Sequence, residues 1–269
     1  KVTAISSYAG GITGYVEATG SVVSCYNSGN VASCATYAAG IAAYSKGKIT
    51  YCQNDGDVRA DSVTQYATSP MPNNAAGIVG FLSGATTVSH NINSGNVYAK
   101  NNVGGISSML ASMGTDFEGN INYGIVTYEK YSELTRGAVI AKNLNSKSTV
   151  KNNYYDSQLG YYGGAATAIV KGINGVTTKE LTSGKALEGL DSTAYDFETG
   201  KYPVLKPFKD EAAAKANRSM VVTFADGNTA DDVFAPATLA NGDKSLVWTL
   251  KQGSKFTVGD GTLSVNIGE

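Results

Sequence analysis

Glycosidase and polysaccharide lyase chemistry needs two carboxylates at a fixed separation, or a base beside a metal ion. Three groups of acidic residues stand close enough in sequence to supply such a pair: Asp55, Asp57 and Asp61; Asp116 and Glu118; and Glu129 and Glu133. All of them lie among residues typical of turns, where Asp commonly bonds the local backbone. His90 is the only histidine, and neither a nucleophile motif nor a phosphate-binding loop is present. We therefore expect no catalytic residue and keep a β-helix carbohydrate-active enzyme as an alternative.

The remaining candidates for site chemistry are oxygen ligands and thiols. Asp55 and Asp57 could contribute to a calcium site, but the sequence around them lacks a full set of oxygen ligands. Cys25 and Cys52 occupy equivalent repeat positions, and we interpret them as small stacked interior residues with a disulfide as the less favoured alternative. Cys34 has no evident partner, and three cysteines are an odd number. We expect neither a metal nor a cofactor.

These residues are positioned by an internal repeat. An asparagine and a glycine two residues later recur along the chain, at Asn27 and Gly29, Asn54 and Gly56, Asn93 and Gly95, and Asn122 and Gly124. An apolar residue five positions before each Asn and a Val two positions after each Gly keep step with them. Successive glycines of this set are 27, 39 and 29 residues apart (29 to 56, 56 to 95 and 95 to 124), so one repeat carries an insertion.

A second signature lies between the Asn and Gly positions of successive repeats. It is Gly-Gly-Ile or Ala-Gly-Ile, then a small residue and an apolar or aromatic one, as at Gly10 to Tyr15 and Ala39 to Tyr44. The insertion falls at Arg59 to Asn74, where Pro70 and Pro72 mark a loop leaving the stack. A loop that projects from a rigid scaffold is free to recognise a partner, so Arg59, Tyr66 and Met71 are the predicted ligand contacts.

The repeat predicts an all-β fold, a right-handed parallel β-helix. The first repeat offers three short strands, at Gly11 to Tyr15, Ser21 to Cys25 and Asn30 to Ser33. Such strands bury their apolar faces only when coils stack about 4.8 Å apart. We predict that the Asn side chains form a hydrogen-bonded ladder along the stack at a turn that tolerates left-handed backbone. The Gly two residues later is predicted to supply a positive φ.

These motifs resemble the GLUG-like repeats of bacterial surface and adhesin-type proteins. The residues that carry the resemblance are Gly10, Gly11, Ile12, Gly14 and Tyr15, then Cys25 to Val31, and an ending at Asn153 to Asp156, Thr178 to Leu181 and Gly200 to Leu205. The resemblance covers about residues 9 to 208. It implies a secreted protein of the bacterial cell surface, often with further domains, and names no receptor.

Four segments follow from these patterns. Residues 1–165 are predicted to be β-helix repeats, 166–208 a C-terminal cap over the last rung, 209–217 an Ala-rich linker, and 218–269 a partial Ig-like β domain. The cap contains a short helix that starts at Thr177 or Thr178 and carries Leu181, Leu187 and Leu190. The last segment resembles a bacterial Ig-like domain around Trp248, in a β-sandwich arrangement.

Composition limits the partners. Lys and Arg number 21 against 22 Asp and Glu, which gives a formal charge of −1 and no electrostatic basis for binding nucleic acid. No apolar run reaches the ~18 residues of a membrane span, so we expect no membrane insertion in this segment. We also expect the chain to be a fragment of a longer protein. Three functions are open: adhesion to a host or extracellular glycan or protein, a passive stalk, and the carbohydrate-active enzyme.

Overall fold

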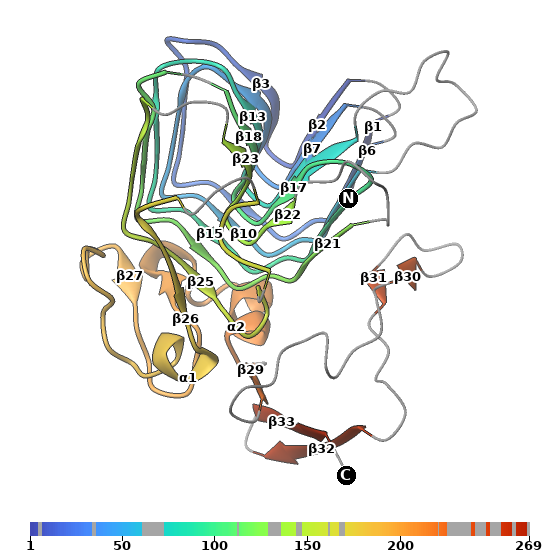
Figure 1. Ribbon diagram of the computed structural model, residues 1–269, viewed down its shortest axis with the longest axis vertical. Helices are drawn as coiled ribbons and strands as arrows, with labels where there is room; N and C mark the ends of the chain where they lie inside the picture. Colours follow the sequence, from blue (N-terminus) through green and yellow to red (C-terminus); the bar gives the residue numbers. More distant parts are fainter. Residues whose placement is uncertain are drawn as a thin grey trace.

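The computed structural model describes residues 1–4, 7–33, 36–60, 73–111, 113–128, 136–143, 147–160, 162–166, 170–219, 221–224, 238–239, 246–247, 254–259 and 262–267. The described strands from β1 (Val2–Ala4) to β26 (Ile173–Val176) form a parallel β-helix, which confirms the predicted fold class. Each coil contributes one short strand to each of five parallel sheets, so the three strands predicted for a coil are five in the structure. Figure 1 looks along the stack, with the coils nearly superposed.

The sheets are lettered A to E and their strands follow in stacking order. Sheet A contains β1 (Val2–Ala4), β6 (Val31–Ser33), β11 (Val58–Ala60), β16 (Val97–Ala99) and β21 (Val126–Tyr128). Sheet B contains β2 (Tyr8–Gly10), β7 (Tyr37–Ala39), β12 (Asn74–Ala76), β17 (Val103–Gly104) and β22 (Arg136–Gly137). Sheet C contains β3 (Thr13–Val16), β8 (Ala42–Ser45), β13 (Val79–Leu82), β18 (Ser107–Leu110) and β23 (Ile140–Asn143). Sheet D contains β4 (Ser21–Val23), β9 (Lys48–Thr50), β14 (Thr87–Ser89), β19 (Asp116–Glu118) and β24 (Thr149–Lys151). Sheet E contains β5 (Tyr26–Asn27), β10 (Gln53–Asn54), β15 (Ile92–Asn93), β20 (Ile121–Asn122), β25 (Asn153–Asp156) and β26 (Ile173–Val176).

A continuous asparagine ladder runs through the interior along sheet E. The Nδ2 atoms of Asn27, Asn54 and Asn93 each donate to the Oδ1 of the next Asn, at 2.7, 2.7 and 2.8 Å, ending on Asn122. Each Nδ2 also donates to the carbonyl oxygen of the Gly two residues later. All four side chains are buried, so their amides exchange water for these bonds without leaving a polar atom unpaired.

At the ladder two opposite walls of the coil come into direct contact, and we call this contact the pinch. The central glycine of the Gly-Gly-Ile signature lies directly against the ladder: a Cβ on Gly40 would be 2.2 Å from the Asn54 Cγ, and one on Gly77 2.1 Å from the Asn93 Cγ. This contact splits the core into two apolar clusters. One cluster includes Ile41, Ile49, Ile78, Val88 and Leu82, and the other includes Val31, Ala38, Val58, Ala75 and Val97. Both signatures are therefore needed to close one coil.

The glycines after each ladder Asn serve close packing, and the prediction of positive φ at them is wrong. The left-handed residues occupy a different column, at the corner between sheets D and E: Ser24, Tyr51, His90, Gly119 and Asn152, with φ of 51, 56, 56, 68 and 53°. Gly56 and Gly95 are instead required because their Cβ atoms would lie 2.3 and 2.1 Å from a glycine carbonyl oxygen of the preceding coil. We call the left-handed set the corner column.

The segment predicted as a cap lies against the side of the β-helix. Residues 157–176 form part of a further turn that pairs with the last full coil through β26 and the Ile140 to Ala165 bridge. Residues 177–219, here called the strap, then run back along the outer face of sheet E, toward the first coil. In Figure 1 the elements of the strap lie outside sheet E. The reason is that sheet E presents apolar side chains outward: Ile92, Ile121 and Tyr154 pack against Leu181, Tyr195 and Leu205 of the strap.

The strap consists of short elements. They are α1 (Thr178–Leu181), β27 (Tyr195–Asp196), β28 (Val204–Leu205), the 3-10 helix η1 (Lys206–Phe208) and α2 (Ala212–Ser219). Thr177 is the N-cap of α1, and with Glu180 it forms a capping box. The helix stops after Leu181, so Leu187 and Leu190 pack from irregular backbone that contains the positive-φ Gly184 and Gly189.

Polar contacts fix the strap from the last coil to the first. Buried Asp156 accepts hydrogen bonds from the hydroxyls of Thr178 (2.6 Å) and Tyr202 (2.7 Å). At the other end the Ala214 amide donates to the Tyr26 hydroxyl at 3.0 Å. The segment predicted as a linker, 209–217, therefore lies largely in α2, which is docked on the first coils.

Beyond the strap the described backbone contains five more strands. These are β29 (Val221–Phe224), β30 (Thr238–Leu239), β31 (Leu246–Val247), β32 (Ser254–Gly259) and β33 (Thr262–Ile267). The order β29-β33-β32 forms one mixed sheet, and β30 pairs with β31. The Ig-like interpretation of this segment stays a prediction.

Candidate functional site: an aromatic corner

Sheets B and C meet at the inward corner made by the Gly-Gly-Ile signature, and aromatic side chains gather on its outside. Tyr8 and Tyr37 come from sheet B, and Tyr15, Tyr44 and Phe81 from sheet C. Because side chains alternate along a strand, each ring points outward while the next residue, such as Leu82, is buried in the core. We call these five residues the aromatic corner.

The rings contact one another both along and between the sheets. Along sheet C, the Tyr15 and Tyr44 ring centroids are 4.8 Å apart with planes 7° from parallel, and Tyr44 is 5.1 Å from Phe81. Between the sheets, the Tyr8 ring lies 5.5 Å from Tyr44 and the Tyr37 ring 5.3 Å from Phe81. The corner is a continuous aromatic surface set on hydrogen-bonded strands.

Exposure is greatest at the first coil. Tyr8 is 40% and Tyr15 37% exposed, whereas Tyr37, Tyr44 and Phe81 are half-buried. Burial raises the pKa of Tyr37 to about 12, so its hydroxyl remains a hydrogen-bond donor at any physiological pH. Lys46 adds a cation 5.6 Å from the Tyr15 ring centroid. The corner therefore combines ring surface, hydroxyls and one ammonium group.

The geometry limits what this surface can bind. Within the sheet C stack the Tyr44 ring is covered by Tyr15 on one side and by Phe81 on the other, so its hydroxyl and edges are what it can offer to a partner. Ring edges and hydroxyls suit a protein surface, where tyrosines supply rigid contact area and hydrogen bonds. A sugar ring packs instead on an open aromatic face.

The predicted ligand contacts are not brought together at this corner. Arg59 lies in β11 of sheet A, in register with Ala32 and Tyr98, and is therefore part of a strand and not of the insertion loop. Tyr66 and Met71 lie outside the described residues. The sequence signal for the corner was the Tyr in the Gly-Gly-Ile signature. The repeat alone does not place this Tyr beside Tyr8 and Tyr37, because their alignment depends on how sheets B and C meet.

Three of the acidic candidates, Asp55, Asp57 and Glu118, are engaged in structural contacts, while Asp61, Glu129 and Glu133 lie outside the described residues. Asp55 accepts from the Tyr26 hydroxyl at 2.7 Å and from the Ser94 hydroxyl at 2.6 Å, and its pKa is raised by burial. Asp57 accepts from the Asn96 amide at 3.0 Å, and Glu118 forms an ion pair with Lys151 at 3.0 Å. These bonds tie neighbouring coils to each other.

Cys25 and Cys52 begin a column whose later members form a second amide ladder, and Cys34 lies outside the described residues. Cys25 and Cys52 are free, and burial raises the pKa of the Cys52 thiol to about 12, so it stays protonated. The next members of their column are asparagines. Asn91 Nδ2 donates to Asn120 Oδ1, and Asn120 Nδ2 donates to Asn153 Oδ1, both at 2.9 Å.

None of the helices among the described residues is long and apolar enough to cross a membrane. Within the same part of the chain, no three His, Cys, Asp or Glu side chains are placed to hold a metal ion. Comparisons with protein family models, curated proteins and solved structures found no match to this chain.

Proposed function

We propose that this chain is a non-catalytic binding segment of a bacterial cell-surface protein and that it acts in adhesion through the aromatic corner. The assignment to the bacterial surface rests on the GLUG-like resemblance of the sequence. The binding role rests on the corner itself, in which two exposed tyrosines stand on strands that pair with the next coil of a scaffold held together by the amide ladder.

The corner favours a protein over a glycan as its partner. Its two most exposed rings, Tyr8 and Tyr15, are each stacked on a ring of the next coil, which holds them in a fixed orientation. Large aromatic side chains held in fixed rotamers lose little entropy on binding, which makes them frequent hot spots. The passive stalk would need no such surface.

An array of extracellular-matrix proteins and glycans tests the proposal. The double variant Tyr8→Ala and Tyr15→Ala should weaken binding to a matrix protein by about tenfold or more. Tyr128→Ala is the matched control, because Tyr128 is also 37% exposed and also has a cation, Arg136, 4.7 Å from its ring.

Three outcomes separate the functions. Loss of binding in the double variant alone supports the aromatic corner. Binding that survives in it but is lost when Tyr66 and Met71 are replaced by Ser moves the site to the insertion. No binding by the unmodified chain leaves the stalk as the better hypothesis.

A further inference from the structure

The corner column contains one place where a ring face is left uncovered. Tyr51 stacks on His90 of the next coil, with ring centroids 5.0 Å apart and planes 14° from parallel. On its other side the column residue is Ser24, whose side chain has no ring to cover the second face of Tyr51. Coils repeat at about 4.8 Å, so the missing ring leaves a space one stacking layer deep.

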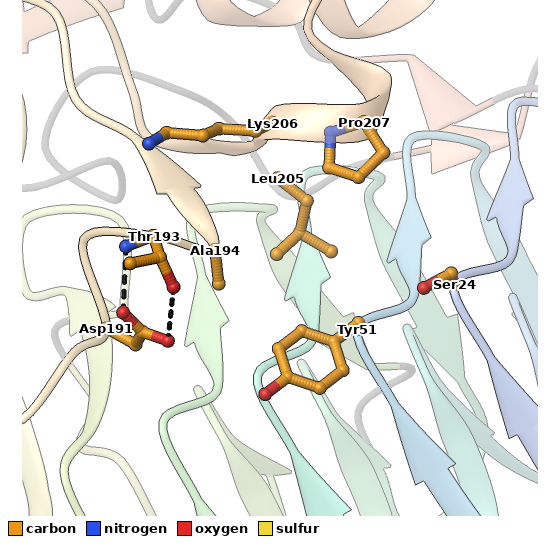
Figure 2. A pocket seen from close by; sticks show the side chains of 8 residues that line it. All are labelled: Ser24, Tyr51, Asp191, Thr193, Ala194, Leu205, Lys206 and Pro207. Atoms are coloured by element: carbon orange, nitrogen blue, oxygen red, sulfur yellow. Dashed lines mark hydrogen bonds between the residues drawn. The ribbon is translucent and has the colours of Figure 1, made fainter.

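The strap borders this space and leaves it open to solvent. A pocket of about 290 Å³ is lined by Ser24 and Tyr51 from the β-helix and by Asp191, Thr193, Ala194, Leu205, Lys206 and Pro207 from the strap (Figure 2). The volume lies just below the range of ordinary small-molecule sites, which start at about 300 Å³. It therefore suits a ligand with a single ring.

The lining is divided into an apolar and a polar part. Tyr51, Ala194 and Leu205 offer apolar surface, while Asp191 and Lys206 are exposed and carry opposite charges. The Asp191 carboxylate accepts from the Thr193 amide at 2.8 Å and the Thr193 hydroxyl at 2.7 Å, which fixes its orientation. These bonds lower the pKa of Asp191, so the group is a carboxylate near neutral pH.

Each carboxylate oxygen of Asp191 accepts more than one hydrogen bond, so acceptor sites remain after Thr193 is bound. A pyranose matches this arrangement. The C–H groups on one face of the sugar are weakly positive and pack on the negative face of an aromatic ring. Its hydroxyls donate to carboxylates and accept from ammonium groups. A flat aromatic ligand would use the Tyr51 face and leave the polar groups without partners.

We propose that the pocket between Tyr51, Ser24 and the strap is a carbohydrate site that binds one neutral pyranose unit, stacked on the open face of Tyr51. This site is separate from the aromatic corner and does not depend on it. It assigns glycan recognition to the corner column, and protein recognition stays with the aromatic corner.

Saturation-transfer difference NMR with methyl pyranosides tests the site. The probes are the methyl glycosides of glucose, galactose, mannose and N-acetylglucosamine, and phenol serves as the flat aromatic comparison. At least one pyranoside should bind with a dissociation constant of about 1 mM, which is typical of ligands with so few atoms. Its ring C–H protons on one face should receive the strongest saturation.

The decisive variant is Ser24→Tyr. It places a ring in the vacant layer, and a tyrosine is tolerated there because Tyr51 has nearly the same φ, 56° against 51°. Binding should fall by about tenfold or more while the melting temperature is kept. Tyr51→Ala should weaken binding similarly, and Tyr15→Ala at the aromatic corner should leave it unchanged.

Three results would overturn the proposal: no pyranoside binds the unmodified chain, phenol binds while no pyranoside does, or the bound pyranoside is unaffected by both Ser24→Tyr and Tyr51→Ala. Circular dichroism of both variants confirms that a loss of binding is not a loss of fold. Failure here leaves the protein-binding proposal standing, because that depends on Tyr8 and Tyr15.

Discussion

The asparagine ladder and the corner column lie three residues apart in every coil, and they follow opposite rules. The ladder is Asn in each of its four coils, whereas the corner column is Ser, Tyr, His, Gly and Asn in turn. The ladder side chains are buried and bond one another, so their chemistry is fixed. The corner residues share only a left-handed backbone, and the side chains described there point outward.

This difference indicates that the two columns have different roles in the β-helix. In the ladder from Asn27 to Asn122 each interior amide bonds the coil on either side, so a change of side chain there leaves buried polar atoms unpaired. A column defined by its φ alone can vary from coil to coil and acquire rings, gaps or charges. Any glycan specificity of this protein is therefore expected at the corner column, and its stability at the ladder.

Adding a methyl group at the pinch should have the largest effect on stability. In Gly77→Ala the new Cβ would lie 2.1 Å from the Asn93 Cγ and 2.3 Å from the Gly105 carbonyl oxygen. Two opposite walls of the coil would have to move apart, so we expect a loss of about 3 kcal/mol or more in the free energy of unfolding. Urea denaturation measures it.

Gly14→Ala is the matched control for the pinch. A Cβ at Gly14 would meet nothing closer than 3.8 Å, at Tyr8. This variant should stay within about 0.5 kcal/mol of the unmodified protein. Equal losses at both positions would mean that the pinch is not a special contact.

Breaking the ladder inside the stack is the next largest effect. Asn54→Ala removes the acceptor of Asn27 and the donor to both Gly56 and Asn93. The buried atoms left unpaired predict a loss of about 1–3 kcal/mol. Asn27→Ala at the open first coil breaks one ladder bond and should cost less, so a larger loss at Asn27 would contradict a ladder stabilised from both sides.

The sequence predicted the β-helix because the ladder column repeats its residue type. Asn and Gly in step with Val indicate stacked coils even without knowledge of the cross-section. The corner column has no residue type in common, so its left-handed backbone was assigned to the wrong glycines. The second column changes residue type as well, since its first two members are Cys25 and Cys52 and only the later ones are Asn, so the repeat predicts its alignment but not its amide ladder.

The candidate sites required information that no single repeat contains. The aromatic corner depends on the angle at which sheets B and C meet, which brings Tyr8 within contact of Tyr44. Residues 166–208 were predicted to cover the last rung, because an exposed strand edge at the end of a stack can pair with other chains. The strap lies along sheet E because Ile92 and Ile121 point outward from neighbouring coils and pack against it. The sequence shows that these two residues are neighbours only once the coils have been aligned.

Changing the corner column should affect stability less than changing the ladder. Tyr51→Asn keeps a residue that tolerates left-handed backbone and removes the stack on His90. We expect a loss of about 0.5–1.5 kcal/mol, the range of an aromatic pair. Thermal unfolding compares it with Asn54→Ala, and a larger loss at Tyr51 would remove the distinction between the two columns.

The smallest effect concerns pH and the one histidine of the chain. Burial lowers the pKa of His90 below its ordinary value of 6.5, although the carboxylates of Glu118 and Asp191 oppose this shift. The folded state then binds the proton more weakly than the unfolded state. The contribution of neutral His90 is complete above pH 6.5 and is lost as the pH falls through 6.5 toward the folded pKa.

His90→Phe keeps a ring on Tyr51 and removes the titration. Between pH 7.5 and 5.5 the unmodified protein should lose stability relative to this variant, measured as the difference in the urea midpoint. The comparison is needed because Asp55, Asp57 and Asp156 have pKa values raised by burial, so protonation favours their folded state and acts in the opposite direction. If the difference in urea midpoint between the two proteins does not change with pH, His90 is as well solvated in the folded protein as in the unfolded chain. The corner column would then be open to water at the layer of His90, next to Tyr51.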